Sequence, residues 1–315
     1  MNDLEVRQLR YFVAVAEELH FGRAAERLGM AQPPLSRAIQ TLERQLGVRL
    51  LERTTRHVAL TTAGEVFLRD ARTALDAITA AAQRARQAGR SEPRLRLALK
   101  ADHDAGLLPR ILSAYQGEEA ALAVELVLGG RGEQAPALRD GRADVALVTG
   151  TFDDRGLDHQ PLLTEPRLAA LAAADPLAAR SHLRLADFAG RRLPGGGRAD
   201  QGEFPPPYAT TARRDGELPH HGLVTASQHS AMDMTQIFKL VELGSIVWFL
   251  PASIARRYPR PEIAYRAVAD LEPVTLSVAW PQETRSAAVA AFVRTATAVA
   301  ETARAETEVP QRVAT

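Results

Sequence analysis

Apolar residues recur every three to four positions at the start of the chain, which predicts a helix. This first run consists of Val6, Leu9, Phe12, Val13, Ala16 and Leu19. A shorter second helix is predicted around Ala24, Ala25 and Leu28. It should stop at Gly29, because glycine adopts a left-handed backbone at little cost. The chain therefore opens with two helices and a tight turn.

A third helix is predicted to begin at Gln32, because Pro33 and Pro34 are tolerated in a first turn. At about 100° per residue, its apolar and polar side chains fall on opposite sides. The apolar side carries Leu35, Ile39, Leu42 and Leu46, and the polar side carries Ser36, Arg37, Gln40 and Arg44. One side is a core face, and the other is available for contacts outside the domain.

Two short helices joined by a glycine turn, the second with outward Ser, Arg and Gln, are typical of major-groove recognition. Arginine can bridge guanine O6 and N7, glutamine can pair with adenine, and serine can bind a phosphate. A merely solvated helix face is the alternative. The segment that follows favours DNA, because residues 50–52 and 57–60 predict a hairpin around the basic turn Arg53-Thr54-Thr55-Arg56. Such a wing can lie along the sugar-phosphate backbone.

A long helix is predicted from a capping box at residues 62–65 to about Ala88. Its small and apolar residues alternate in steps of four and three, as in a coiled coil. The repeat is Phe67, Ala71, Ala74, Ile78, Ala81, Ala85 and Ala88. Burial of this helix within its own domain is the alternative, but the pattern favours pairing with a second copy. Two copies related by a two-fold axis recognise a pseudo-palindromic site.

The rest of the chain predicts an α/β domain. Short strands are expected at residues 94–99, 123–128 and 144–148, separated by helical stretches, which implies a parallel sheet with right-handed crossovers. Further strands are expected near 167–173 and 274–279, and an alanine-rich helix from about Arg285, with a tail from Glu301 that frays.

Composition narrows the functional classes. The 315 residues are 46% hydrophobic and 24% charged, as in folded domains, and the length calls for more than one domain. The absence of cysteine excludes disulfides and thiolate metal sites. The N-terminus lacks the pattern of a secretory signal and no apolar run could span a membrane, so we expect a cytoplasmic protein. Net charge is only +1, so DNA binding must depend on a local patch.

Three classes of protein are rivals to this interpretation: an enzyme, a non-regulatory small-molecule binding protein and a nucleoid-type DNA binder. A zinc enzyme built on His220, His221 and His229 fits no familiar ligand spacing, and a serine hydrolase lacks the G-x-S-x-G motif. A non-regulatory small-molecule binding protein does not explain the Gln32 to Arg37 pattern. A nucleoid-type DNA binder does not explain over two hundred residues of α/β domain. We therefore expect no enzyme, no catalytic residues, no metal and no cofactor.

The N-terminal sixty residues resemble the LysR-type transcriptional regulators. The similarity covers Leu9-Arg10-Tyr11-Phe12, Phe21 to Leu28, Ala31-Gln32-Pro33-Pro34-Leu35-Ser36-Arg37, Leu42-Glu43 and Leu60 to Gly64. The resemblance implies an N-terminal winged helix-turn-helix (1–62), a linker and dimerisation helix (62–90) and a C-terminal effector-binding domain (91–315). That domain is expected to have two α/β lobes like type 2 periplasmic binding proteins, lobe I at about 91–165 and 270–305, and lobe II at about 166–269. The resemblance also implies the DNA-contacting set Gln32, Pro33, Pro34, Ser36, Arg37, Gln40, Arg53 and Arg56.

Effector contacts are expected where the strands end, since ligands of open α/β sheets lie at the carboxyl ends of strands. The set expected there is Asp102, His103, Arg131, Thr149 and Thr151. Gly196, His229 and Ser230 are added from second-lobe segments that precede helical stretches, where backbone N–H groups can bind a carboxylate. Relatives that sense acids commonly carry a small hydroxyl residue where Asp102 stands. Asp102 therefore either pairs with an amine or hydroxyl of the effector, or caps its own helix while Arg131 binds an acid.

The expected partners follow from these features. They are double-stranded DNA with a pseudo-palindromic operator, a small-molecule effector with organic acids as a candidate class, and a second copy of the chain, as a homodimer or a dimer-of-dimers tetramer. No membrane partner is expected.

Overall fold

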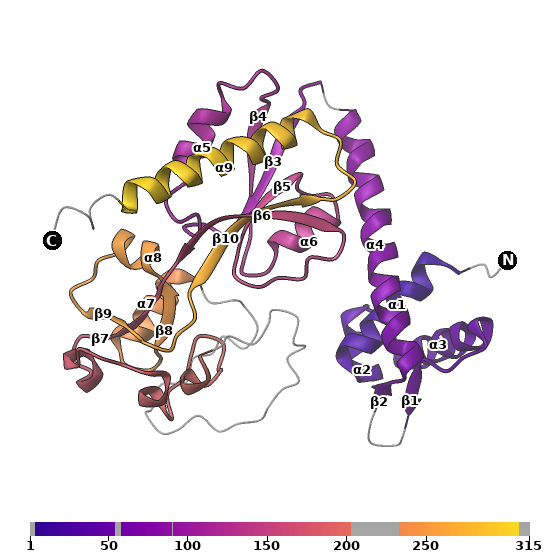
Figure 1. Ribbon diagram of the computed structural model, residues 1–315. Helices are drawn as coiled ribbons and strands as arrows, with labels where there is room; N and C mark the ends of the chain where they lie inside the picture. The colour runs from indigo at the N-terminus through magenta and orange to yellow at the C-terminus, as the bar shows by residue number, and fades with distance from the viewer. Residues whose placement is uncertain (1–3, 54–57, 90, 203–232, 309–315) are drawn as a thin grey trace. The chain divides into compact units, whose positions relative to one another are not determined.

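The computed structural model describes residues 4–53, 58–89, 91–202 and 233–308 (Figure 1). The chain forms two compact units, one made mainly of the first 90 residues and one made mainly of the rest. Each has its own hydrophobic core.

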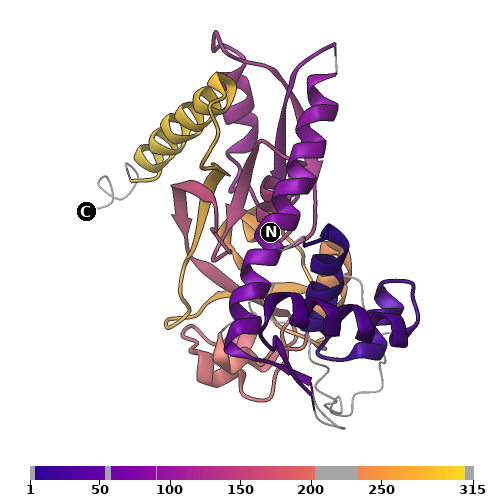
Figure 2. The same ribbon diagram turned by 90° about the vertical axis from the view of Figure 1, so that its right-hand side faces the viewer.

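Three helices build the core of the N-terminal unit: α1 (Val6–Glu18), α2 (Phe21–Arg27) and α3 (Gln32–Leu46). They are gathered at one end of the long helix α4 (Thr62–Ala88), as Figure 2 shows. Gly29, at φ 65°, lies just after α2, in the left-handed conformation expected of the turn. The start of α3 at Gln32 is confirmed, with prolines in its first turn.

A small antiparallel hairpin follows, made of β1 (Leu51–Arg53) and β2 (Val58–Leu60). This confirms the predicted wing. The end of α4 at Ala88 is also as predicted, but its cap is one residue earlier than expected, because the hydroxyl of Thr61 accepts the hydrogen bond from the Gly64 amide at 2.9 Å. Two adjacent threonines made both positions plausible caps from the sequence.

The C-terminal unit contains a five-stranded sheet in the order β4-β3-β5-β10-β6. Its strands are β3 (Arg94–Leu99), β4 (Ala123–Leu128), β5 (Val145–Thr149), β6 (Leu157–Glu165) and β10 (Val274–Pro281). As expected, β3 pairs in parallel with β4 and β5. Strand β10 is antiparallel to both β5 and β6, so the sheet as a whole is mixed.

Helices cover both faces of this sheet. On one face, α5 (Leu108–Tyr115) and α9 (Ala287–Glu308) pack on alternate residues of the central strands, and Tyr115 meets Phe292 edge to face at 5.3 Å. On the other face, α6 (Gln134–Arg139) packs on Ala98, Ala146 and Val148. Helix α9 continues to Glu308, so the predicted fraying is wrong for residues 301–308, and the rest of the predicted tail, 309–315, lies outside the described residues. Its last turns are held by Arg110, whose two terminal nitrogens donate to Glu306 at 2.8 and 3.1 Å.

A second, three-stranded sheet has the order β8-β7-β9 and is antiparallel throughout. Its strands are β7 (Arg167–Ala172), β8 (Trp248–Pro251) and β9 (Ile263–Ala267). Helices α7 (Met234–Glu242) and α8 (Ala252–Arg257) pack on it, with short 3-10 turns η1 (Pro176–Ala179), η2 (Leu185–Phe188) and η3 (Ala199–Gln201) beside it. We call the five-stranded part lobe I and the three-stranded part lobe II.

The stability of lobe I depends on the packing of α9 against the sheet. Phe292 of α9 has a fully buried side chain and is the position at which this packing can be tested. Phe292→Ala is expected to lower the free energy of unfolding of the C-terminal unit by about 3 to 5 kcal/mol, because it removes an aromatic side chain from a packed core. Urea unfolding followed by circular dichroism measures the loss. Leu128→Ala is the matched control, since Leu128 is 63% exposed and should cost less than about 0.5 kcal/mol. Equal effects of the two changes would contradict this assignment of the core.

Candidate functional site

Helix α3 presents two distinct faces. Leu35, Ile39 and Leu42 are fully buried in the core of the N-terminal unit. Opposite them, Ser36 is partly exposed, and the predicted residues Gln32, Pro33, Pro34, Arg37 and Gln40 are exposed. Three buried anchors on successive turns fix the rotation of the helix about its axis. The polar residues predicted from the sequence are therefore turned together toward the outside of the unit.

The end of α3 is tied to the hairpin. The carboxylate of Glu43 accepts hydrogen bonds from the backbone amides of Leu50 and Leu51 at 2.9 and 3.1 Å. Arg44 is occupied within the helix, where it donates to the carbonyl of Gln40 and the hydroxyl of Thr41. The recognition face and the base of the wing therefore form one rigid piece.

The hairpin is also fixed to the start of α4. The hydroxyl of Thr61 donates to the carbonyl of Arg49 at 2.8 Å while capping α4. A Cβ atom at Gly64 would lie 2.0 Å from the Leu50 carbonyl oxygen, so only glycine fits this crossing. Of the predicted wing residues, Arg53 ends strand β1 opposite Val58, and Arg56 lies outside the described residues.

In lobe I, three loops meet at the carboxyl ends of the parallel strands β3, β4 and β5. They carry Lys100 to Asp104, Arg131 and Thr149 respectively. The Thr149 hydroxyl donates to the backbone carbonyl of His103 at 3.2 Å, which joins the first loop to the third. The topology thus brings together Asp102, His103, Arg131 and Thr149 from the predicted effector set.

Two cationic side chains, Lys100 and Arg131, lie close enough at these loop ends to act on each other. Burial, followed by the charge of Arg131, lowers the pKa of Lys100 to about 8. Burial, followed by the charge of Lys100, lowers the pKa of His103 to about 4, so the imidazole is neutral at pH 7. Among the residues that the structure describes, no acceptor pairs with the Lys100 ammonium. A partly buried ammonium next to a guanidinium is an arrangement that an anion stabilises.

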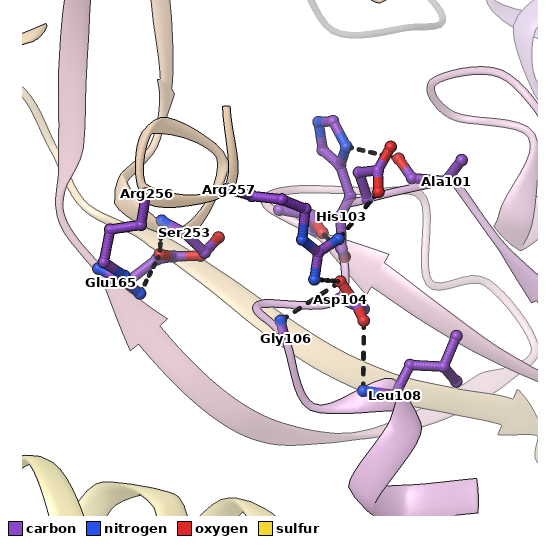
Figure 3. A network of polar contacts seen from close by, with 11 residues as sticks. Ala101, His103, Asp104, Gly106, Leu108, Glu165, Ser253, Arg256 and Arg257 are labelled. Atoms are coloured by element: carbon purple, nitrogen blue, oxygen red, sulfur yellow. Dashed lines mark hydrogen bonds and ion pairs between the residues drawn. The ribbon is translucent and has the colours of Figure 1, made fainter. Parts of the chain in front are cut away.

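Asp102 and Asp104 lie on the same loop, and both bind Arg257 at the end of α8 in lobe II. Figure 3 shows Arg257 beside Asp104. Asp104, not Asp102, bonds the first turn of α5, through the Leu108 amide at 3.3 Å. The hypothesis that Asp102 caps its own helix is therefore wrong. Its carboxylate accepts from Arg257 Nη1 at 2.9 Å instead.

A second contact joins the lobes at the other end of α8. Glu165, the last residue of β6, accepts hydrogen bonds from the amide and hydroxyl of Ser253, both at 2.7 Å. Between these contacts lies a cavity of about 10 Å³ lined by His103, Thr149, Glu165, Ser253 and four apolar or small neighbours. Such a volume holds about one water molecule, so a larger ligand enters only if the walls move.

Other predicted effector residues are not joined to this cluster. Thr151 is exposed beyond β5. Gly196 lies in lobe II ahead of η3, and its carbonyl accepts a hydrogen bond from Arg192 at 3.0 Å. His229 and Ser230, like the rival zinc ligands His220 and His221, lie outside the described residues. Within the parts that the structure does describe, no group of acidic and histidine side chains is arranged to hold a metal ion.

A larger open hollow of about 680 Å³ runs along β9 and the turn after β7 in lobe II. It contains none of the predicted effector residues. Its walls are mostly alanine and proline, and the two charged side chains beside it, Asp175 and Arg266, are bonded to Arg191 and to backbone carbonyls. We assign it no role.

Two family models match the chain. Residues 6–65 match the bacterial regulatory helix-turn-helix protein model of the lysR family, and residues 88–301 match the LysR substrate binding domain. The chain belongs to the LysR family. It is a DNA-binding transcription regulator with an effector-binding domain, as its sequence predicted, and not an enzyme.

Similar proteins span nearly the same length as this LysR regulator. The uncharacterized HTH-type transcriptional regulator YnfL of Escherichia coli (strain K12) is 34% identical over 286 residues, which are 89% of this chain and 93% of YnfL. The Hca operon transcriptional activator HcaR of the same organism is 30% identical over 291 residues, covering 92% and 96%. The crystal structure of CbnR, a LysR family transcriptional regulator, aligns over 94% of this chain and 99% of CbnR with a TM-score of 0.49 at 28% identity.

Sequence reasoning missed Arg257 in this LysR regulator. Neither alternative for Asp102 included this cation, which comes from a residue 155 positions later. The only signal was the pair of carboxylates itself, which called for a cation. All but two of the 39 basic residues are arginines, so the sequence offered no means of choosing among them. No helix in the described part of the chain has the length and apolar character needed to cross a membrane.

The charge state of Lys100 can be measured directly, because Lys100 and Lys239 are the only lysines of the chain. After reductive ¹³C-methylation, the NMR titration of Lys100 is expected near pH 8, since burial and Arg131 disfavour its charged form. Lys239, 67% exposed, is the internal reference, and Lys100→Arg identifies the signal. Arg131→Gln should move the Lys100 titration upward. Two coincident titrations would contradict this description of the site.

Proposed function

We propose that this regulator binds a pseudo-palindromic operator as a homodimer, with the exposed face of α3 in the major groove and the wing on the phosphate backbone. The contacting set is Gln32, Pro33, Pro34, Ser36, Arg37, Gln40, Arg53 and Arg56. The observation that carries the proposal is the division of α3 into a fully buried apolar face and an exposed polar face. Arg37 and Gln40, one turn apart, suit guanine and adenine edges respectively. Because an operator lies on the chromosome, operator binding supports a cytoplasmic location.

The proposed dimer contact is α4. Its first turns belong to the N-terminal unit, where Phe67 meets Phe12 at 5.0 Å and Ala71 is buried. Farther along, Ile78 is 42% exposed and Ala81 and Ala85 are exposed, although all continue the same repeat. Small side chains allow two helices to approach closely. A tetramer built as a dimer of dimers is the assembly that family resemblance favours.

We further propose that the effector is an organic acid bound at the loop ends of lobe I, near Lys100, Asp102, His103, Arg131 and Thr149. The cationic pair Lys100 and Arg131 supports an anionic ligand, and the cavity of about 10 Å³ supports a change in lobe arrangement on binding. A ligand shifts such an equilibrium only by its different affinities for the two arrangements, about 1 to 3 kcal/mol in typical cases. This mechanism uses the expected division into a DNA-binding domain, a linker helix and a two-lobed effector domain.

Arg37 and Arg53 are expected to contribute differently to DNA binding. Arg37→Ala should weaken operator binding by about 1 to 3 kcal/mol and reduce base discrimination, because it removes a base contact. Arg53→Ala should weaken binding to all sequences about equally, because it removes a phosphate contact. Electrophoretic shifts at fixed salt, on the DNA upstream of the coding region and on a scrambled duplex, measure both effects.

These two arginines are matched, since both are single charge removals in the same unit. If Arg37→Ala left discrimination between the operator and the scrambled duplex intact, the proposed role of α3 would be wrong. Equal, non-specific binding of both duplexes by the unchanged protein would contradict operator recognition altogether.

The charge class of the effector can be tested with two ligands of the same size and opposite charge, benzoate and benzylamine. Benzoate is expected to shift the Lys100 NMR signal and raise its pKa, because a carboxylate stabilises the ammonium form. Benzylamine should do neither. Asp102→Ser should leave the benzoate response in place. A response to the amine that Asp102→Ser abolishes would overturn the proposal in favour of a cationic effector, and silence toward both ligands would place the effector site elsewhere.

A further inference from the structure

The first loop of lobe I carries opposite charges within five residues. Lys100 and His103 belong to the proposed anion site, and Asp102 and Asp104 lie between and beside them. The His103 imidazole is close enough to Lys100, Arg131 and Asp102 for all three charges to act on its pKa. Two uncompensated carboxylates at this point would therefore repel an anionic ligand and cancel the field of Lys100 and Arg131.

Arg257 compensates both carboxylates at once. Its Nη1 donates to Asp102 Oδ1 at 2.9 Å, and its Nη2 donates to Asp104 Oδ1 at 3.1 Å. The guanidinium thus bridges two different carboxylates, with one charge-assisted hydrogen bond to each. Its side chain is 34% exposed, whereas that of Asp104 is only 6% exposed. The bridge closes over the loop from the lobe II side, as Figure 3 shows for Arg257 and Asp104.

The loop contains two residues with left-handed backbone. Asp102 has φ 61°, which aspartate tolerates, and Ala105 has φ 52°, which costs alanine free energy. Within the loop, the Asp104 carboxylate accepts from the amides of Gly106 and Leu108, each at 3.3 Å. Both contacts are long for hydrogen bonds, so the ion pair with Arg257, at 3.1 Å, is the shortest of these contacts of Asp104.

We propose that Arg257 determines the charge selectivity of the effector cleft, by neutralising Asp102 and Asp104 from the opposite lobe so that Lys100 and Arg131 are the charges that face the ligand. This inference rests on the proposed effector site. Arg257 is a positioning residue, because it acts through the two aspartates and not on the ligand.

The origin of Arg257 in lobe II has a regulatory consequence. If the lobes move so that α8 leaves the loop, Asp102 and Asp104 regain their uncompensated charge and the cleft loses affinity for anions. An anionic effector therefore binds more tightly to arrangements in which the cavity walls open while Arg257 still reaches the loop. Such a difference in affinity between two arrangements is what a ligand needs in order to shift their populations.

The test uses the Lys100 NMR signal of the full-length protein and benzoate as the probe. Arg257→Gln is expected to raise the pKa of Lys100 by about 0.5 to 1 and to weaken benzoate binding about threefold to tenfold, because Asp102 becomes an uncompensated neighbouring charge. The double variant Asp102→Asn with Arg257→Gln should return both quantities most of the way to their original values. Asp102→Asn alone should change little.

Arg256→Gln is the matched control. Arg256 precedes Arg257 on the same helix, its side chain is 70% exposed, and its nearest carboxylate, Glu165, is 4.0 Å away. It should leave Lys100 and benzoate binding unchanged. Equal effects of Arg256→Gln and Arg257→Gln, or an Arg257→Gln effect that Asp102→Asn fails to reverse, would overturn the proposal, since both outcomes indicate a general structural change. If benzoate does not bind the unchanged protein, the proposed effector class fails, while the response of Lys100 to Arg257→Gln still decides the role of Arg257.

Discussion

The C-terminal unit depends on the pairing of β6 with β10. These strands are antiparallel over their whole length, from Val274 opposite Glu165 to Pro281 opposite Leu157. The chain leaves lobe I after Glu165 and returns to it at Val274, so the register places the two connections side by side. If one lobe rotates against the other, the backbone must therefore bend at these two adjacent connections. The same register puts the Glu165 carboxylate at the end of the strand, where it holds the first residues of α8 through Ser253.

This arrangement makes α8 a connection between the lobes at both of its ends. Its start is bonded to Glu165 on the crossing strand, and its end is bonded to the loop after β3 through Arg257. The loop in turn is joined to the end of β5 by Thr149 and His103. The contacts described here between the loop ends and lobe II are thus ion pairs and hydrogen bonds, and the packed cores of lobe I lie on the two faces of the larger sheet.

Sequence patterns predicted the structural features that are determined by residues close together in the sequence. The two prolines located the start of α3, and alternating apolar residues located β3 and β4 with their observed bounds. Features that depend on distant partners were missed. The helix end at Glu308 is stabilised by Arg110, 196 positions before Glu306, and the partner of Asp102 is 155 positions later. Residue periodicity carries no information on such pairs, because their meeting is set by the packing of whole elements. The same holds for the tie between Glu43 and the wing, which is local in sequence but requires the hairpin to form first.

The partial exposure of the ion pairs between Arg257 and the two aspartates suits a contact between the lobes that can both form and break. Exposed ion pairs typically contribute about 0.2 to 1 kcal/mol each, whereas breaking a fully buried pair costs about 3 to 5 kcal/mol. The side chains of Arg257 and Asp102 are 34% and 29% exposed, so their pair belongs near the lower range, and only the arm to Asp104 is strongly shielded. Allosteric coupling in proteins is commonly about 1 to 3 kcal/mol. A fully buried bridge between the lobes would exceed that range and lock one arrangement, and a fully exposed bridge would scarcely bias the equilibrium. The bridge formed by Arg257 has one shielded ion pair, to Asp104, and one more exposed ion pair, to Asp102. Its contribution lies between these limits, where an effector of ordinary affinity can shift the equilibrium between the two lobe arrangements.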